Sequence, residues 1–274
     1  MNFCGYKIGE RQRFFLIAGP CVIETRDSTL KVAEQLKSIT ERLNIFFIFK
    51  SSYNKANRSS ISSYRGPGLY KGIKILAEIK EQLDIPVTTD LHSVEEISQI
   101  KDTIDLIQIP AFLCRQTDLL VKAAESGKPV NVKKGQFIAP KDVSYIIDKL
   151  KNSFCNSYAI TERGYTFGYN NLVVDMRSLG MIRSLQIPVI FDATHSTQLP
   201  GGGEVSGGER EFAPLLARSA IAARIDGLFM EVHQNPHNAL CDATNQYSID
   251  KIEKLLKLLI EIDDIVKKRP CDEF

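Results

Sequence analysis

The stretch Phe14-Phe15-Leu16-Ile17-Ala18 is an uninterrupted apolar run, and Gly19-Pro20-Cys21 follows it directly. A short run without polar alternation is typical of a strand that is buried on both faces, as in a parallel sheet. The segment after it, Ser28–Leu43, has the apolar spacing of a helix, with Ser28 expected as its N-cap. A buried strand followed by such a helix is the building unit of parallel α/β folds.

The same unit recurs along the whole chain. Further strands are expected at Ile45–Phe49, Pro86–Thr89, Asp105–Ile109, Val130–Val132, Ser157–Thr161, Pro188–Phe191 and Gly227–Val232. The helices after them are expected at Leu69–Leu83, Val94–Ile100, Thr117–Ser126, Lys141–Leu150, Asp175–Leu185, Glu209–Ala223 and Ile249–Lys267. Eight units favour a closed (β/α)8 barrel (TIM barrel) of the α/β class over an open sheet, and barrels of this kind typically have about 250 residues. We expect one catalytic domain at 14–274, preceded by an N-terminal cap or hairpin at 1–13.

The composition of the 274 residues excludes several classes of protein. A net charge of only +2, with 25% charged and 43% hydrophobic residues, predicts neither nucleic-acid nor membrane binding. The six cysteines form no C-x-x-C pair, and no apolar run follows a basic start, so we expect a cytoplasmic protein with free thiols. The apolar run Ile45–Phe49 is too short to span a bilayer.

Polar and charged residues follow almost every expected strand, where the strand ends and the loop to the helix begins. Burying such groups is unfavourable unless they are paired or used. In folds of this class the strand ends surround the active site. The residues concerned include Cys21, Lys50, Asp90, Gln108, Lys133, Arg163, Asp192, His195 and Glu231, with Asp242 a short way on.

Cations are prominent among these residues. Taken singly, each could be a solvated loop residue or the partner of a barrel carboxylate. Taken together they indicate phosphate binding, because Arg offers a bidentate fork and Lys a point charge. The cations are Lys50, Lys55, Lys133 and Arg163, with Arg58 beside them.

A second set of residues has the donor types of a metal site. A thiolate, an imidazole and two carboxylates suit a borderline divalent ion. The residue types leave another interpretation open, namely a buried cysteine, a hydrogen-bonded histidine and carboxylates paired with the cations. His233 and His237 also remain open as ligands, whereas we interpret His92 as a loop or supporting residue and Cys241 as a packing residue. The set consists of Cys21, His195, Glu231 and Asp242.

Several long motifs in these loops resemble one known family. The stretch Lys50-Ser51-Ser52-Tyr53-Asn54-Lys55-Ala56-Asn57-Arg58-Ser59-Ser60 is similar to the corresponding loop of 3-deoxy-D-manno-octulosonate 8-phosphate synthases. Further matching motifs lie at 63–68, 108–118, 131–134, 167–176 and 191–195, and the match runs in order from about Phe15 to Val266. The resemblance implies an eight-fold barrel, usually a homotetramer. It also implies an enzyme that joins phosphoenolpyruvate to D-arabinose 5-phosphate, releasing phosphate, to make the eight-carbon sugar acid of bacterial lipopolysaccharide.

The resemblance also implies roles for individual residues. Lys133 and Arg163 match positions that hold the phosphate of phosphoenolpyruvate, and Lys50 and Lys55 match positions near its carboxylate and the aldehyde. The implied phosphoenolpyruvate site comprises Lys50, Lys55, Gln108, Ala111, Lys133 and Arg163. The implied arabinose 5-phosphate site comprises Asn57, Arg58, Ser59 and Asp90, with Arg115 and Gln116 reaching the site of a neighbouring subunit.

The family has metal-dependent and metal-independent branches, and the metal-independent branch carries Asn at the position of Cys21. Gly19-Pro20-Cys21 and the loop at 199–203 resemble the metal-dependent branch. The implied ligands are Cys21, His195, Glu231 and Asp242, and zinc, iron, manganese and cobalt all suit them. From the chemistry of this reaction we hypothesise that Lys55 donates a proton to the forming alkoxide. We also hypothesise that the metal, with Asp242 or His195, positions the water.

Three alternatives remain. One is the related 3-deoxy-D-arabino-heptulosonate 7-phosphate synthase, which uses erythrose 4-phosphate and has a loop resembling Lys-Pro-Arg-Thr where this chain has Lys-Ala-Asn-Arg-Ser-Ser. A second is a Schiff-base aldolase that uses Lys50 or Lys133. The third is a sugar-phosphate binder without catalytic activity.

Overall fold

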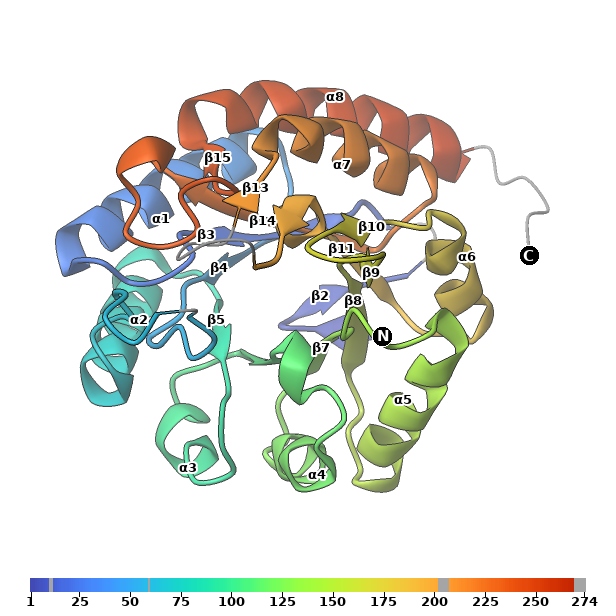
Figure 1. Ribbon diagram of the computed structural model, residues 1–274, viewed down its shortest axis with the longest axis horizontal. Coiled ribbons are helices and arrows are strands. Elements are labelled where there is room, and N and C mark those ends of the chain that lie inside the picture. Colours follow the sequence, from blue (N-terminus) through green and yellow to red (C-terminus); the bar gives the residue numbers. More distant parts are fainter. Residues whose placement is uncertain (10–11, 59, 202–206, 269–274) are drawn as a thin grey trace.

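The computed structural model describes residues 1–9, 12–58, 60–201 and 207–268. Eight parallel strands form a closed barrel, which confirms the predicted (β/α)8 fold (Figure 1). Closure is set by the last strand, which pairs with both the preceding strand and the first. The barrel strands are β3 (Phe15–Gly19), β4 (Phe47–Lys50), β5 (Val87–Asp90), β6 (Leu106–Ile109), β7 (Val130–Lys133), β8 (Tyr158–Glu162), β11 (Val189–Asp192) and β14 (Gly227–His233).

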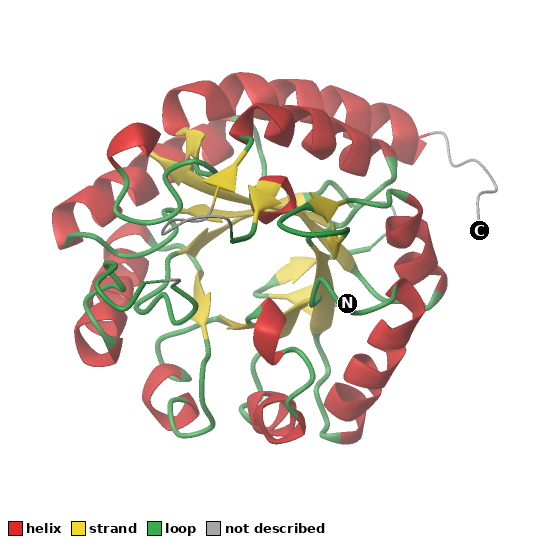
Figure 2. Cartoon of the chain, in the orientation of Figure 1, coloured by secondary structure: helices red, strands yellow, loops and turns green. Residues whose placement is uncertain are grey.

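The helices surround the barrel on the outside, one after each strand (Figure 2). The large apolar core lies between the two layers, as the continuous apolar runs of the strands require. The helices are α1 (Arg26–Arg42), α2 (Leu69–Leu83), α3 (Ile97–Ile100), α4 (Thr117–Glu125), α5 (Val143–Asn152), α6 (Arg177–Ser184), α7 (Ala213–Ala222) and α8 (Ile249–Lys268).

Several helix beginnings differ from the expectation: α5, α6 and α7 start at Val143, Arg177 and Ala213, two to four residues later than expected, and α1 and α3 differ as well. Helix α1 starts earlier, because Thr25 and not Ser28 is its N-cap; the Thr25 side chain accepts from the Ser28 N–H while the Ser28 hydroxyl accepts from the Thr25 N–H. This reciprocal capping box satisfies two amide groups that have no partner inside the helix. Helix α3 is confined to four residues, so the expected first turn at Val94 is not helical.

The interior of the barrel is filled by side chains from alternate strand positions. Phe15, Ile17, Ile48 and Phe229 belong to this inner cluster. The antiparallel hairpin of β1 (Asn2–Phe3) and β2 (Tyr6–Lys7) adds to it, since Phe3 is fully buried with its ring centroid 5.6 Å from that of Phe15. The hairpin therefore packs into the amino-terminal end of the barrel, and Figure 1 shows β2 inside the ring of strands.

Additional short strands lie at the opposite end of the barrel, where the barrel strands end. A hairpin of β9 (Tyr165–Thr166) and β10 (Leu172–Val173) follows β8, and β12 (Gln198–Leu199) pairs with β13 (Gly207–Gly208) after β11. Strand β15 (Tyr247–Ser248) pairs in parallel with the last two residues of β14. These additions concentrate loop structure at the end where the polar residues lie. Among the described residues, no helix has both the length and the hydropathy to cross a bilayer.

Replacement of Phe3 by Ala is expected to lower the free energy of unfolding by about 3–5 kcal/mol, because it leaves a cavity inside the barrel. Replacement of Phe154 by Ala removes the same atoms from the surface, because Phe154 is 87% exposed. This change should alter the free energy of unfolding by no more than about 0.5 kcal/mol. Urea denaturation followed by circular dichroism compares the two variants with the parent. Equal midpoints for the two variants would show that the hairpin does not contribute to the core.

Candidate active site

A cavity of about 720 Å³ opens at the carboxyl ends of the barrel strands. Volumes of this order suit small-molecule ligands. Twelve of the predicted site residues line it together: Lys50, Lys55, Asn57, Arg58, Asp90, Gln108, Ala111, Lys133, Arg163, His195, Glu231 and Asp242. Of the other four, Cys21 is buried behind Lys55 and Asp242, Ser59 lies outside the described residues, and Arg115 and Gln116 are exposed away from the cavity.

Lys133 ends β7 and lies between a carboxylate and an aromatic ring. Its ammonium forms an ion pair with Asp192 of β11 and lies 3.4 Å from the centroid of the Phe229 ring. Burial alone would raise the pKa of Asp192, but His195 and Lys133 outweigh it and hold that pKa well below its usual range. Asp192 is therefore ionised and gives the buried Lys133 a counter-ion.

Arg163 follows β8, and its guanidinium faces the same cavity. One Nη atom donates to Gln136 at 3.1 Å, and the other donates to Gln198 at 2.7 Å and to the backbone oxygen of His195 at 3.1 Å. The buried Nε–H has no hydrogen-bond partner within the described chain. An unsatisfied buried donor on a cation is unfavourable, and an anion in the cavity would satisfy it.

Lys50 is the most deeply buried cation of the site. Its ammonium donates to Glu231 at 2.8 Å and to the backbone oxygen of Cys21 at 3.0 Å, and Asp90 lies 3.9 Å away. Burial opposes the charge, but Glu231 and Asp90 raise the pKa of Lys50 above its usual value. Because Asp90 also accepts from Gln108 at 2.8 Å, the first, second, third and fourth strands of the barrel are linked through polar contacts.

Asp242, in the loop after β14, is the acceptor for a second group of cations. Lys55 donates to it at 2.8 Å, and Arg58 lies 3.7 Å from its other oxygen. Although burial opposes ionisation, Lys55 and His195 hold the pKa of Asp242 well below its usual range. The backbone of Asp242 has φ of 46°, a left-handed conformation that is uncommon outside glycine and that recurs at functional sites.

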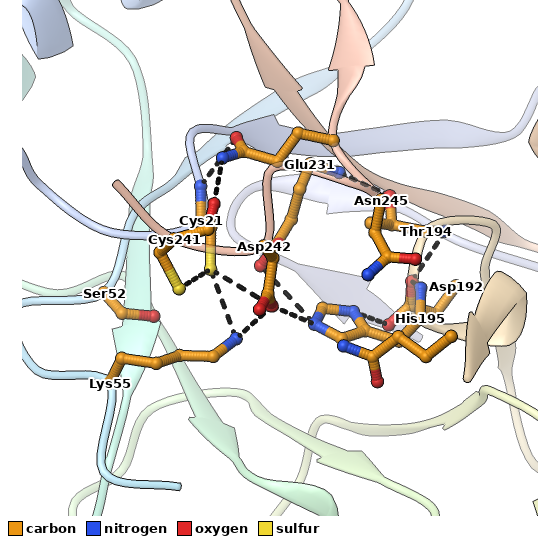
Figure 3. Close-up of polar contacts among 12 residues, drawn as sticks. Cys21, Ser52, Lys55, Asp192, Thr194, His195, Glu231, Cys241, Asp242 and Asn245 are labelled. Carbon is orange, nitrogen blue, oxygen red and sulfur yellow. Dashed lines mark hydrogen bonds and ion pairs between the residues drawn. The ribbon is translucent and has the colours of Figure 1, made fainter. Parts of the chain in front are cut away.

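The predicted metal ligands come together around Asp242 (Figure 3). Ligand atoms of His195, Glu231 and Asp242 lie within 4.8 Å of one another, and those of Cys21, Cys241 and Asp242 form a second such group. The ammonium of Lys55 lies between the groups, 3.2 Å from the Cys21 sulfur. One oxygen of the buried Glu231 has no hydrogen-bond partner in the described structure. The donor set and this unsatisfied oxygen fit a divalent ion.

His195 is oriented in the way that metal-binding histidines usually are. Its Nδ1 lies 2.7 Å from Asp192, which accepts its proton, so Nε2 faces Glu231 at 3.7 Å and Asp242 at 3.9 Å. Such a carboxylate contact selects one tautomer and leaves the other nitrogen free for a ligand. Asp192 thus serves both Lys133 and His195, although the sequence analysis gave it only a place at a strand end.

Cys241 and Gln246 are site residues that the sequence analysis did not assign. Cys241 is buried, as a packing residue would be, but its sulfur also lies 3.2 Å from that of Cys21 and accepts from Arg58 at 3.1 Å. Gln246 accepts from the Cys21 N–H at 3.2 Å and donates to the Cys241 backbone at 2.8 Å. Both residues lie in the loop after the last barrel strand. The only available signal was the position of Cys241 next to Asp242.

Replacement of Glu231 by Gln should lower the free energy of unfolding by about 3 kcal/mol, because it leaves the buried Lys50 ammonium without its main counter-ion. The matched change is Glu125→Gln, which breaks an exposed pair with Lys122 and should cost no more than about 1 kcal/mol. Urea unfolding of both variants measures the difference. Similar values for the two variants would mean that Glu231 does not compensate the charge of Lys50.

The fold and the cavity define a barrel enzyme with several buried cations in its cavity, beside a cluster of side chains whose types could hold a metal ion. The sequence profile of the DAHP synthetase I family matches residues 3–268, and the chain belongs to this family. The chain is 54% identical over 265 residues to a 2-dehydro-3-deoxyphosphooctonate aldolase of Geobacter sp. (strain M21), covering 96% of this chain and 97% of that protein.

Other relatives of this chain carry the same name. The protein of Azoarcus sp. (strain BH72) is 53% identical over 272 residues, with 98% of each chain covered. The protein of Acidithiobacillus ferrooxidans (strain ATCC 53993 / BNL-5-31) is 51% identical over 274 residues, covering 100% of this chain and 98% of that protein. Phosphooctonate in these names is the eight-carbon product of the synthases that the motifs resemble, so the predicted resemblance is confirmed.

Proposed function

We propose that this chain condenses phosphoenolpyruvate with D-arabinose 5-phosphate and water. The products are 3-deoxy-D-manno-octulosonate 8-phosphate, for lipopolysaccharide biosynthesis, and inorganic phosphate. The observation that carries the proposal is a single cavity in which cations lie at two places, Lys133 with Arg163 and Arg58 beside Lys55. Two phosphorylated substrates need two such places. The name of the relatives favours the octulosonate product over the heptulosonate alternative.

The cavity supports a role for each group of residues. Lys133 and Arg163 would hold the phosphate of phosphoenolpyruvate, and Lys50, Gln108 and Ala111 would contact the rest of that substrate. Asn57, Arg58 and Asp90 would bind arabinose 5-phosphate, and Ser59 remains a prediction for the same site. The cations would oppose the negative charge that both substrates bring into one cavity.

The reaction joins C3 of phosphoenolpyruvate to the aldehyde carbon, while water adds to C2 and phosphate leaves by cleavage of its C–O bond. Lys55 is the proposed proton donor to the alkoxide that forms from the aldehyde. Burial opposes its charge, but Asp242 raises the pKa of Lys55 well above the usual value, so it carries a proton to give. His195 and Asp242 are the proposed groups that position the attacking water.

We further propose that Cys21, His195, Glu231 and Asp242 hold a divalent ion, with zinc, iron, manganese and cobalt as candidates. When bound there, such an ion would polarise the aldehyde and orient the water. Burial, and then the neighbouring Cys241, raise the pKa of the Cys21 thiol, so this cysteine would lose its proton only when a strong ligand-binding partner such as a metal ion displaces it.

Two further proposals concern the assembly and its location. A homotetramer would use Arg115 and Gln116 to complete the site of a neighbouring subunit; in support, both are exposed, whereas Ala111, Phe112 and Leu113 just before them line the cavity. We propose a cytoplasmic location. In support, the five described cysteines are free, as is usual for cytosolic proteins.

Phosphate release from phosphoenolpyruvate should require arabinose 5-phosphate and should be at least about tenfold slower with erythrose 4-phosphate. The reason is that the loop containing Asn57 and Arg58 resembles the loop of synthases that use arabinose 5-phosphate. A phosphate-release assay with each aldose measures the preference. Faster turnover of erythrose 4-phosphate would contradict the substrate assignment. Covalent trapping by borohydride with substrate would indicate a Schiff-base aldolase, and binding without turnover would indicate a sugar-phosphate binder.

Removal of the metal ion should abolish activity, and Cys21→Asn should weaken metal binding by at least about tenfold because a direct ligand is lost. Metal content after dialysis against graded chelator, measured by mass spectrometry, gives the affinity independently of activity. Cys4→Asn is the matched control, because Cys4 is remote from the site and its φ of 53° suits Asn. Equal retention by both variants would refute the role of Cys21.

A further inference from the structure

His92 lies in the wall of the cavity, two residues after Asp90 at the end of β5. The sequence analysis interpreted it as a loop or supporting residue, but its side chain is 14% exposed and faces the ligand space. Its Nδ1 lies 3.2 Å from the hydroxyl of Tyr53 and 3.7 Å from a carboxylate oxygen of Glu96, while Nε2 has no hydrogen-bond partner in the described part of the chain. The state of Nδ1 therefore determines what Nε2 offers to a ligand.

The Tyr53 hydroxyl has only one proton, and its neighbours determine where that proton points. The hydroxyl lies 2.6 Å from a carboxylate oxygen of Glu96. The same oxygen accepts hydrogen bonds from the backbone N–H of His92 at 2.8 Å and from the backbone N–H of Ser93 at 3.2 Å. Burial opposes ionisation of Glu96, but the contacts from His92 and Tyr53 lower its pKa to about 2. An ionised carboxylate can only accept, so Tyr53 donates its proton to Glu96.

The oxygen of Tyr53 can then only accept from His92, which places a proton on Nδ1. In a neutral imidazole with Nδ1 protonated, Nε2 is an acceptor. Tyr53 itself is held firmly: it is fully buried, and its Cβ would lie 2.3 Å from a Cβ added at Gly72 of α2. The rings of Tyr53 and His92 also meet edge to face, with centroids 5.4 Å apart.

We propose that His92 binds a hydroxyl group of the aldose phosphate through Nε2, with Tyr53 and Glu96 as positioning residues that hold the ring in the Nδ1–H tautomer. The proposal rests on the proposed function and deepens it, since it names a group that recognises the polyhydroxylated substrate. His92 would act beside Asp90, and the pair would present two acceptors on one loop to neighbouring hydroxyls of the sugar. An acceptor with a free lone pair suits a hydroxyl and repels a phosphate oxygen, so the proposal excludes the phosphate group from this position.

The tautomer can be measured directly by ¹⁵N NMR at about pH 8, where histidine side chains are ordinarily neutral. The chain has four histidines, and comparison with the His92→Asn protein identifies the signals of His92. We expect a protonated Nδ1 and an unprotonated Nε2, and Tyr53→Phe should shift the ring toward the Nε2–H tautomer. Protonated Nε2 in the parent would overturn the positioning role of both residues, and no change in Tyr53→Phe would overturn the role of Tyr53.

Kinetics test the binding role separately, because the Asn amide can replace Nδ1 and the longer Gln side chain can replace Nε2. His92→Asn should raise the KM for arabinose 5-phosphate about tenfold, as expected for the loss of one hydrogen bond, and leave the KM for phosphoenolpyruvate unchanged. His92→Gln should recover most of the affinity. Equal effects of the two variants, or a change confined to phosphoenolpyruvate, would overturn the assignment. Lack of turnover by the parent would refute the proposed function, whereas normal turnover with an unchanged KM in His92→Asn would refute this inference alone.

Discussion

The ion pair between Lys50 and Glu231 is the interaction on which the rest of the site depends. Glu231 lies on β14 and Lys50 on β4, on either side of β3. The backbone oxygen of Cys21, two residues after the end of β3, also accepts from the Lys50 ammonium. The pair therefore joins the first, second and last strands at the place where the barrel closes. Since both groups are buried, each needs the other to remain charged, and their charge keeps the cavity polar in an apolar barrel.

Much of the fold could be predicted because a barrel strand buried on both faces leaves a distinct apolar run in the sequence. The segment 14–18, for example, was displaced by only one residue from β3. Helix beginnings were less predictable, since the exchange of hydrogen bonds between Thr25 and Ser28 shifts the cap by three residues without changing the apolar pattern. The short helix α3 shows the same limit of prediction. Apolar residues at helical spacing over 94–100 do not specify at which residue the helix begins.

The candidate site was predictable to the extent that position along a strand determines position in space. Every parallel strand ends at the same rim, so Lys50, Lys133 and His195 had to meet once closure was assumed. Contacts between loops follow no such rule. The approach of Cys241 to Cys21, and the double role of Asp192, depend on the path of two loops and on side-chain directions that spacing does not encode.

The near-neutral charge of the chain and its strongly charged cavity have a common explanation. Among the described residues, the three lysines that line the cavity already have carboxylate partners: Lys133 has Asp192, Lys50 has Glu231, and Lys55 has Asp242. Their charges are therefore balanced within the cavity, so net charge cannot reveal them. An incoming phosphate competes with carboxylates that are already in place. Anion binding in this cavity therefore replaces existing ion pairs with new ones. The gain in binding free energy is largest at Arg163, because its buried Nε–H has no hydrogen-bond partner that the anion must replace.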